Sequence, residues 1–367
     1  MSLNELFIKH VGPGGLSGCT LREWFALLKQ NRFAIIPRYW PRAALTTLNS
    51  AMNSMKMKRE RQFDKQVEAT DVQSPLIVLG VWRSGTTHLH NLLAKDTRYA
   101  FPNTYQALFP NTFLSTEEKM APSLDSMMAP TRPMDKVKIA CAEPQEDEFA
   151  LIPSGLSFAV QFAFTKTGAD YWRFMTLRNA SGAEIEQWKA KLHWFLKKVT
   201  FKHQRPLVLK SPGHMGRIKL LLEMFPDAKF VHIRRHPYDV FRSAIHAGET
   251  VLPHWTFQRI IEDEAALLER HAELCDAFFE EKDLIPSGNF CDIAFEDLDA
   301  NPMETIRSIY EQLSLPDFAE FEPTLREYVD SLKGYKKNSL SELPKATKQR
   351  ISQRLTQCFE AWGYDSK

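Results

Sequence analysis

The chain has 367 residues, enough for one large α/β domain or two smaller ones with an ample core. Hydrophobic residues make up 44% and charged residues 25%, an ordinary globular composition, and the net charge of +2 argues against nucleic acid as a general partner. The five cysteines are scattered and form no C-x-x-C pair, which fits a reducing compartment and no zinc site. No signal peptide pattern or membrane-spanning run stands out, so we expect a cytoplasmic protein. From the cysteine spacing we also expect no bound metal.

Residues 20–65 form a basic and aromatic stretch, in which ten Lys and Arg stand against three acids. After Pro41, four apolar side chains fall on one helical face and a basic cluster follows them. One interpretation is an ordinary helix packed on the rest of the protein; the other is a surface that rests on an anionic membrane or near a lipid substrate. We expect residues 1–70 to be a helical extension packed on a core of residues 71–367. The four apolar residues are Leu45, Leu48, Met52 and Met55.

The stretch from residue 75 to 94 has the pattern of a strand, a tight loop and a helix. The apolar run at 76–79 predicts a buried parallel strand, and apolar residues resume at helical spacing from Leu89. Backbone N–H groups of such a loop, with the positive end of the helix, attract an oxyanion, normally a phosphate. The alternative is a tight turn with an incidental arginine. The side chains and the glycine that favour the anion site are Arg83, Gly85, Thr86 and Thr87.

The loop is not a standard kinase loop. Gly80 and Gly85 have the separation of the two Walker glycines, but Thr86 stands where that motif requires Lys. A Walker kinase also needs an Asp elsewhere to hold Mg²⁺, and no segment of the sequence points to one.

Residues 101–134 are rich in Pro, Met and Phe with few periodic signals, so we expect a long loop that lines or covers something apolar. A run of acids follows, ahead of an aromatic stretch that extends to Phe174. One interpretation is a solvated first turn of a helix. The other is a general base beside an apolar wall, supplied by Glu146, Asp147 or Glu148.

Two further apolar runs, at 207–209 and 230–233, predict strands, and polar side chains follow each of them. Lys210 and His214 come after the first run, and Arg235 after the second. In open α/β sheets, ligands bind outside the carboxyl ends of the strands, so these side chains are placed for binding. The alternative for the arginine is an ion pair with acids of the following helix. Two anion sites at strand ends suit a ligand with phosphates at both ends.

The two motifs G-V-W-R-S-G-T-T-H and V-H-I-R-R-H-P-Y-D-V-F-R-S together resemble the sulfotransferase superfamily, whose donor is 3′-phosphoadenosine 5′-phosphosulfate. The connecting L-K-S-P-G-H and E-D-E-F-A-L resemble its bacterial branch, and the resemblance covers roughly residues 75–300. It implies a three-layer, P-loop-like α/β fold with a central parallel sheet flanked by helices. Residues 71–367 would then be the sulfotransferase domain, behind the N-terminal helical extension.

The resemblance also implies roles for named residues. In that family the strand, loop and helix bind the 5′-phosphosulfate, and an Arg and a Ser eight residues apart bind the 3′-phosphate. The basic loop near Tyr335 and Lys336 keeps only part of the family pattern; it is a candidate contact for the same phosphate, with a solvated basic turn as the alternative. The residues assigned to the 5′ end are Arg83, Ser84, Gly85, Thr86 and Thr87, and those assigned to the 3′-phosphate are Arg235 and Ser243.

The implied reaction is metal-independent, in-line transfer of a sulfuryl group to a hydroxyl, catalysed by positioning and charge stabilisation. Arg83, with Lys210, would neutralise the leaving oxygen. The general base is open between His214 and the acidic run with Glu146, because Pro212 occupies the position of the family's usual histidine.

The acceptor is the least determined part of the prediction. The aromatic and Met-rich content of residues 101–174 suits an apolar small molecule, a lipid- or sterol-like alcohol, although an apolar core has the same composition. Two other functions stay open at this point. One is a nucleotide-dependent kinase with a degenerate Walker loop, and the other is a non-catalytic nucleotide-binding module.

Overall fold

The computed structural model describes residues 14–129, 131–132, 134–260, 263–334 and 340–366. Its contacts divide the chain into two compact units. The first unit takes in residues 1–72, 102–204 and 247–262, and the second unit takes in residues 73–101, 205–246 and 263–367. The division expected from the sequence, an extension of residues 1–70 and a domain of residues 71–367, stays a prediction.

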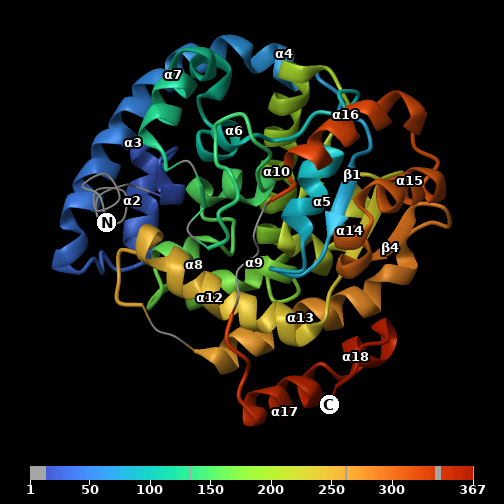
Figure 1. Ribbon diagram of the computed structural model, residues 1–367. Helices are drawn as coiled ribbons and strands as arrows, with labels where there is room; N and C mark the ends of the chain where they lie inside the picture. The colour runs from blue at the N-terminus through green and yellow to red at the C-terminus, as the bar shows by residue number, and fades with distance from the viewer. Residues whose placement is uncertain (1–13, 130, 133, 261–262, 335–339, 367) are drawn as a thin grey trace. The chain divides into compact units, whose positions relative to one another are not determined.

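The second unit is built on a four-stranded parallel sheet in the order β2-β1-β3-β4 (Figure 1). In the register, Val78 of the central strand β1 lies opposite both Lys210 and Val231. The carboxyl ends of β1, β2 and β3 therefore meet at one edge. Three strands lie within one residue of where the sequence predicts them: β1 (Leu76–Leu79), β2 (Val208–Lys210) and β3 (Lys229–Arg234). The fourth strand is β4 (Phe290–Ala294).

Helices cover both faces of this sheet. Alternate strand residues such as Val78 and Ile233 form one core with α5 (Thr86–Leu93), α15 (Pro302–Gln312) and α16 (Phe318–Ser331). On the other face, Phe278 of α13 (Glu264–Glu281) stacks on His232, with ring centroids 4.2 Å apart, and meets Phe290 at 6.3 Å. This is the predicted three-layer arrangement.

In the remaining helices of the second unit, the structure differs from the sequence prediction at two places. The apolar spacing of residues 257–279 predicts one helix; this is wrong, because the carboxylate of Asp263 caps the backbone N–H of Ala266 and α13 begins only at Glu264. The sequence also predicts one terminal helix over residues 347–362; this is wrong, because the helix breaks at Leu355. The helices are α11 (Ile218–Met224), α12 (Pro237–Trp255, whose residues after 246 belong to the first unit), α14 (Phe295–Ala300), α17 (Lys345–Arg354) and α18 (Thr356–Trp362), with short 3-10 turns η6 (Pro212–Gly216) and η7 (Lys282–Leu284).

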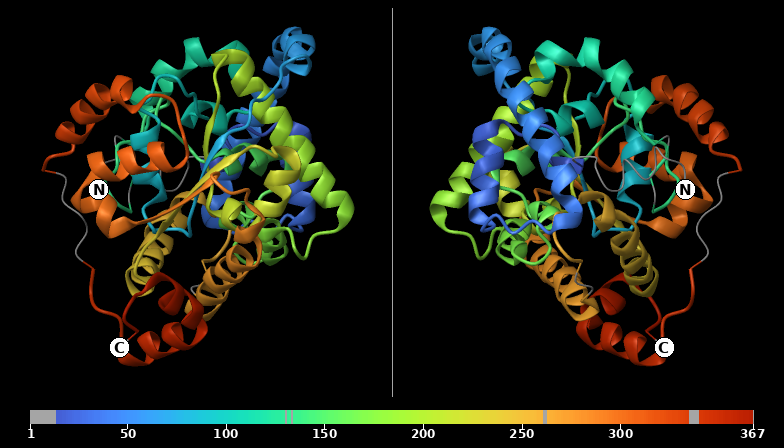
Figure 2. Two further views of the ribbon diagram at one scale, coloured as in Figure 1. Left: turned by 90° about the vertical axis from the view of Figure 1, so that its right-hand side faces the viewer. Right: turned by 90° about the vertical axis from the view of Figure 1, so that its left-hand side faces the viewer.

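The first unit is built mainly from helices, and α2 and α3 lie side by side in it (Figures 1 and 2). The predicted long loop at 101–134 is wrong: Asn103 and Gln106 form a reciprocal capping box that starts a helix there, and a second helix follows. Within the described residues, no helix has the length and apolar character needed to cross a membrane. The elements are α2 (Leu21–Gln30), α3 (Trp40–Glu60), α4 (Asp64–Glu68), α6 (Thr104–Leu108), α7 (Phe113–Met127), α8 (Val160–Ala163), α9 (Arg173–Thr176) and α10 (Gly182–His203), with the 3-10 turns η1 (Gly14–Leu16), η2 (Pro37–Tyr39), η3 (Arg61–Phe63), η4 (Asp147–Ser154) and η5 (Gly168–Trp172).

Candidate active site

The loop between β1 and α5 is a tight turn that requires glycine. Gly85 immediately precedes α5 with φ +105°, in the left-handed region, and a Cβ there would lie 2.4 Å from Cδ2 of Phe295. A Cβ on Gly80 would lie 2.6 Å from Oγ of Ser84. The Ser84 hydroxyl is buried and donates to the carbonyl of Val81 at 2.9 Å. The backbone of this loop is therefore held close, at the N-terminus of a helix, as an anion site requires.

Three side chains that the sequence assigns to two separate anion sites meet in the second unit. Nε of Arg83 donates to Oγ of Ser243, in α12, at 3.0 Å. Nη1 of Arg235, which directly follows β3, donates to the backbone carbonyl of Arg83 at 3.1 Å. The two predicted clusters therefore form one continuous group of donors at the carboxyl edge of the sheet.

Arg235 is a partly buried cation that has a second cation beside it. Its guanidinium lies over the ring of Phe295, 4.2 Å from the centroid. Burial lowers the pKa of Arg235 and the charge of Arg83 acts in the same direction, whereas Asp239 and Glu296 oppose them. Two neighbouring guanidinium groups in a partly desolvated place favour a bound anion, which offsets both costs.

Lys210 and His214 lie at the same edge of the sheet. Lys210 is the last residue of β2 and is buried, with Val78 opposite it in the neighbouring strand. His214 lies in η6, which contacts both β1 and α13, and its side chain is fully buried. The structure therefore brings these two residues and the loop after β1 to one edge of one sheet.

The acidic run lies in the first unit, whereas His214 belongs to the second. Asp147 and Glu148 are buried, so a solvated acidic turn is wrong for those two, while Glu146 is half-buried just before η4. Within the part of the chain that the structure describes, no group of three or more His, Cys, Asp and Glu side chains is arranged to hold a metal ion. Tyr335 and Lys336 lie outside the described residues.

A family model described as the sulfotransferase family matches residues 75–320 of the chain. The chain belongs to the sulfotransferase family. The matched range includes the whole parallel sheet and every candidate site residue except Tyr335 and Lys336. The protein is therefore an enzyme of the transferase class, and a nucleotide-dependent kinase is not favoured.

Curated relatives and solved structures agree with this assignment. The chain is 33% identical over 353 residues to omega-hydroxy-beta-dihydromenaquinone-9 sulfotransferase Stf3 of Mycobacterium bovis and of Mycobacterium tuberculosis, covering 95% of this chain and 90% of each relative. The crystal structure of sulfotransferase STF9 from Mycobacterium avium matches with a TM-score of 0.73 and 18% identity, over 94% of this chain and 92% of that one. Sulfotransferase STF1 from Mycobacterium tuberculosis H37Rv matches with a TM-score of 0.63 and 17% identity, over 91% and 92%. These structures confirm the predicted sulfotransferase fold.

Phe295 lies in this candidate site, and sequence reasoning missed it. It is the first residue of α14, directly after β4, and its ring contacts Arg235 on one side and leaves no room for a Cβ at Gly85 on another. The ring therefore lies close to both the loop after β1 and the guanidinium of Arg235. The signal that could have found it is its position, since β4 ends at the same edge as the strands that carry the predicted binding residues.

Proposed function

We propose that this sulfotransferase transfers the sulfuryl group of 3′-phosphoadenosine 5′-phosphosulfate to a hydroxyl of an apolar, lipid-like alcohol. The observation that carries the choice of donor is the contact chain from Arg235 through Arg83 to Ser243. A nucleotide with anionic groups at both its 3′ and 5′ positions needs two neighbouring sets of donors, and this chain joins them. ATP or AMP lacks the 3′-phosphate that Arg235 and Ser243 would bind.

The residues fit such a donor. Gly85, Thr86 and Thr87 present the N-terminus of α5, and a Cβ on Gly80 or Gly85 would collide with Ser84 or Phe295, so glycine at both positions keeps the loop tight. In this proposal the loop of residues 83–87 holds the 5′-phosphosulfate. Arg235 and Ser243 hold the 3′-phosphate, and Tyr335 and Lys336 are proposed as further contacts to it.

The donor supplies an activated sulfuryl group, and the protein supplies position, positive charge and a base. Transfer forms a bond between the acceptor oxygen and sulfur and breaks the bond from sulfur to the bridging oxygen. Arg83 and Lys210 stabilise the negative charge on that bridging oxygen. A ring nitrogen of His214 or the carboxylate of Glu146 accepts the proton of the acceptor hydroxyl. No protein-bound metal has a role in this scheme.

The proposal of an apolar acceptor rests on two observations. The 33% identical relative is named for a menaquinone derivative, a lipid-like acceptor. In addition, half-buried aromatic rings gather beside the acidic run: Phe149 and Phe162 both meet the ring of Trp255, with centroids at 5.2 and 6.1 Å. Half-buried aromatic rings suit an apolar ligand better than a charged one. A sterol-like alcohol is an apolar ligand of the same kind and is included in this proposal.

We also propose a cytoplasmic location for the enzyme. All five cysteines are buried free thiols, the state that a reducing compartment maintains. Fractionation of cells that express the tagged protein tests this, and secretion into the medium would contradict it.

The first experiment compares thermal stabilisation by 3′-phosphoadenosine 5′-phosphate with that by ATP and by AMP. A ligand that binds the folded state raises the melting temperature in proportion to the logarithm of its excess over Kd. We expect the bisphosphate to stabilise the protein and the other two to have little effect at equal concentration. Equal stabilisation by all three would overturn the choice of donor.

A transfer assay then tests the acceptor. With labelled donor, we expect sulfation of long prenyl alcohols and little sulfation of short polar alcohols. Binding of the bisphosphate without transfer to any alcohol of a broad panel would favour the non-catalytic alternative, and a strict Mg²⁺ requirement with ATP as donor would favour a kinase.

A further inference from the structure

Helix α3 of the first unit packs on its neighbours through polar residues. Its buried face carries Arg42, Thr46, Ser50 and Asn53, which recur at spacings of four and three and so lie on one side of the helix. The apolar face predicted from the sequence points the other way. Leu48 is 58% exposed, so α3 packs on the first unit through its polar face and leaves this apolar side chain outside.

Hydrogen bonds and an ion pair hold the polar face in place. Arg42 donates to the carbonyls of Pro253 and Thr256, and Nδ2 of Asn53 donates to the carbonyls of Ser17 and Cys19 at 2.8 and 3.0 Å. These bonds fix the orientation of α3 about its axis.

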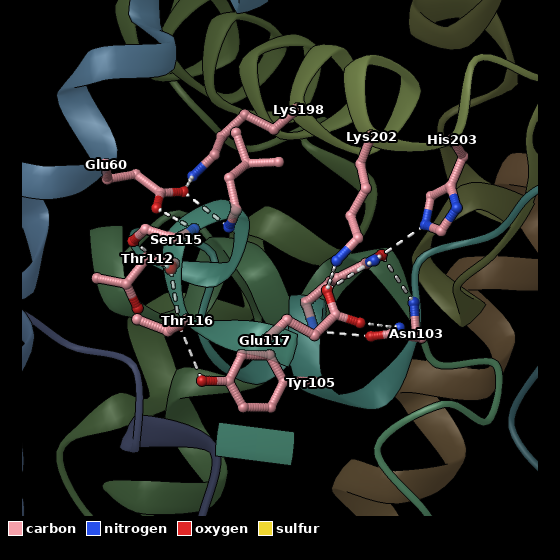
Figure 3. A network of polar contacts seen from close by, with 12 residues as sticks. Glu60, Asn103, Tyr105, Thr112, Ser115, Thr116, Glu117, Lys198, Lys202 and His203 are labelled. Carbon is pink, nitrogen blue, oxygen red and sulfur yellow. Dashed lines mark hydrogen bonds and ion pairs between the residues drawn. The ribbon is translucent and has the colours of Figure 1, made fainter. Parts of the chain in front are cut away.

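The C-terminal end of α3 is fixed in the same way (Figure 3). Figure 3 shows the carboxylate of Glu60 between Nζ of Lys198, at 2.7 Å, and the backbone N–H of Ser115, at 2.9 Å. Glu60 and Lys198 are both buried. The helix therefore cannot turn its apolar face inward without leaving buried polar groups unsatisfied.

The opposite face carries a stripe of large exposed apolar side chains. Trp40, Leu48 and Met55 are 62%, 58% and 64% exposed, and their spacing places them on one side of the helix. Single exposed apolar residues are ordinary on protein surfaces. Here they are concentrated: of the eight large hydrophobic side chains exposed among the described residues, five lie between residues 25 and 55, namely Phe25, Phe33, Trp40, Leu48 and Met55.

Basic residues border this stripe at both ends of the helix. Arg38 precedes α3, Lys58 and Arg59 lie in its last turn, and Arg61 directly follows it; all four are exposed. Between residues 38 and 61 the chain has one acid, Glu60, and it is buried. Apolar side chains with Trp among them, next to Lys and Arg, match the chemistry of an anionic bilayer surface. A second copy of the chain would bring like charges together, which opposes self-association through this face.

We propose that the exposed face of α3, defined by Trp40, Leu48 and Met55 with the four basic residues around them, docks the enzyme on an anionic membrane surface. Trp40, Leu48 and Met55 enter the interface between headgroups and acyl chains, and the basic side chains bind the headgroups. The proposal does not depend on the donor or the acceptor proposed above. It predicts binding to lipid in the absence of any substrate.

The test uses the full chain and vesicles of phosphatidylcholine, with and without phosphatidylglycerol. We expect co-sedimentation with the anionic vesicles, weakened by salt because the Debye length falls from about 10 Å at 0.1 M to about 3 Å at 1 M. Replacement of the apolar stripe (Trp40→Ser, Leu48→Ser and Met55→Ser together) should weaken binding by about tenfold or more. Neutralisation of the helix end (Lys58→Gln, Arg59→Gln and Arg61→Gln together) should remove the preference for anionic lipid.

Leu284→Ser is the matched control, because Leu284 is 52% exposed and lies in the second unit. We expect this variant to bind vesicles as the wild type does. Unchanged melting temperatures will show that the variants fold. Equal binding to neutral and anionic vesicles, wild-type binding by the stripe variant, or a dimer in solution that the stripe substitutions dissociate would each overturn the proposal.

Discussion

Nε of Arg83 lies 3.0 Å from Oγ of Ser243, across 160 positions of sequence. One residue belongs to the loop after β1 and the other to α12, and Arg235 is linked to the same loop through the carbonyl of Arg83. A substitution at any of these positions should therefore weaken the binding of both the 3′ and the 5′ group of the proposed nucleotide. This makes the group of donors testable by single substitutions.

Ser243→Ala removes both the contact to Arg83 and the proposed contact to the 3′-phosphate. A hydrogen bond to a charged group contributes about 1.5–3 kcal/mol, so we expect the Kd for 3′-phosphoadenosine 5′-phosphate to rise by about tenfold or more. Isothermal titration calorimetry measures this directly. Ser331→Ala, at an exposed serine of the same unit, is the control and should bind as the wild type does. Equal affinity of the two variants would contradict the assignment of Ser243.

Gly85→Ala should abolish bisphosphate binding as well as lower stability, an effect larger than the strain of a positive φ alone would cause. The comparison is Gly288→Ala, because Gly288 also has positive φ (+84°) but a Cβ there meets nothing within 4 Å. Alanine in the left-handed region should destabilise both variants by about 1–2 kcal/mol. Only in Gly85→Ala does the new Cβ also push against Phe295 and so move the ring beneath Arg235. We expect urea unfolding to show a loss in both, and bisphosphate binding to be lost only in Gly85→Ala. Wild-type binding by Gly85→Ala would argue against a ligand in this loop.

The two candidates for the base can be separated by turnover. We expect His214→Ala or Glu146→Gln to lower kcat by about a hundredfold or more, the usual contribution of a general base, with the affinity for the bisphosphate nearly unchanged. His214 is fully buried, so His214→Ala leaves a cavity. His214→Gln is the second variant, because a glutamine side chain is larger than alanine and leaves less of a cavity. Glu143→Gln, in the same acidic run as Glu146, is the control. If neither candidate affects kcat, the base is elsewhere.

Acid sensitivity of the first unit should depend on Glu184. Hydrogen bonds from Arg173, and then from Ser181, lower the pKa of Glu184 from 4.5 to about 2. A carboxylate whose pKa is lower in the folded state stabilises the fold above its unfolded pKa, and that stabilisation is lost as the pH falls from 4.5 towards 2.

Glu184→Gln should therefore lower the free energy of unfolding at neutral pH by about 1 kcal/mol, with the difference from wild type shrinking towards pH 2. Denaturant unfolding at a series of pH values measures both. Glu186→Gln is the control on the same helix, since its side chain is 73% exposed and pairs only loosely with Lys189 at 3.2 Å. A constant difference between Glu184→Gln and wild type at all pH values would show that the charge has no part in it.

Much of the sheet could be predicted from the sequence because its strands are short apolar runs with polar residues directly after them. Arg83, Lys210 and Arg235 were found as strand-end residues, and parallel pairing places strand ends together. Phe295 was not found, because an aromatic residue after a strand has no distinctive chemistry until its neighbours are known. Its contacts to Gly85 and Arg235 exist only in the folded chain.

Helix faces were harder to predict than strands. The apolar residues of α3 have the spacing of a core face, and nothing local shows that Arg42 and Asn53 find buried carbonyl partners from residues distant in sequence. Likewise, the Pro- and Met-rich content of residues 101–134 concealed two helices, the first of which begins at a capping box formed by Asn103 and Gln106.

The order in which the chain builds its two units has a consequence for biosynthesis. The first unit draws on residues up to 262, and the second unit begins at residue 73 and takes in the last helix. As the nascent polypeptide leaves the ribosome, the first unit lacks residues 247–262 and the second unit lacks residues 263–367 until those residues are made, and many pairings span large sequence separations, which slows folding. We expect fragments that end near residue 204 to aggregate rather than to fold, and the newly made enzyme to depend on chaperones until its last helices emerge.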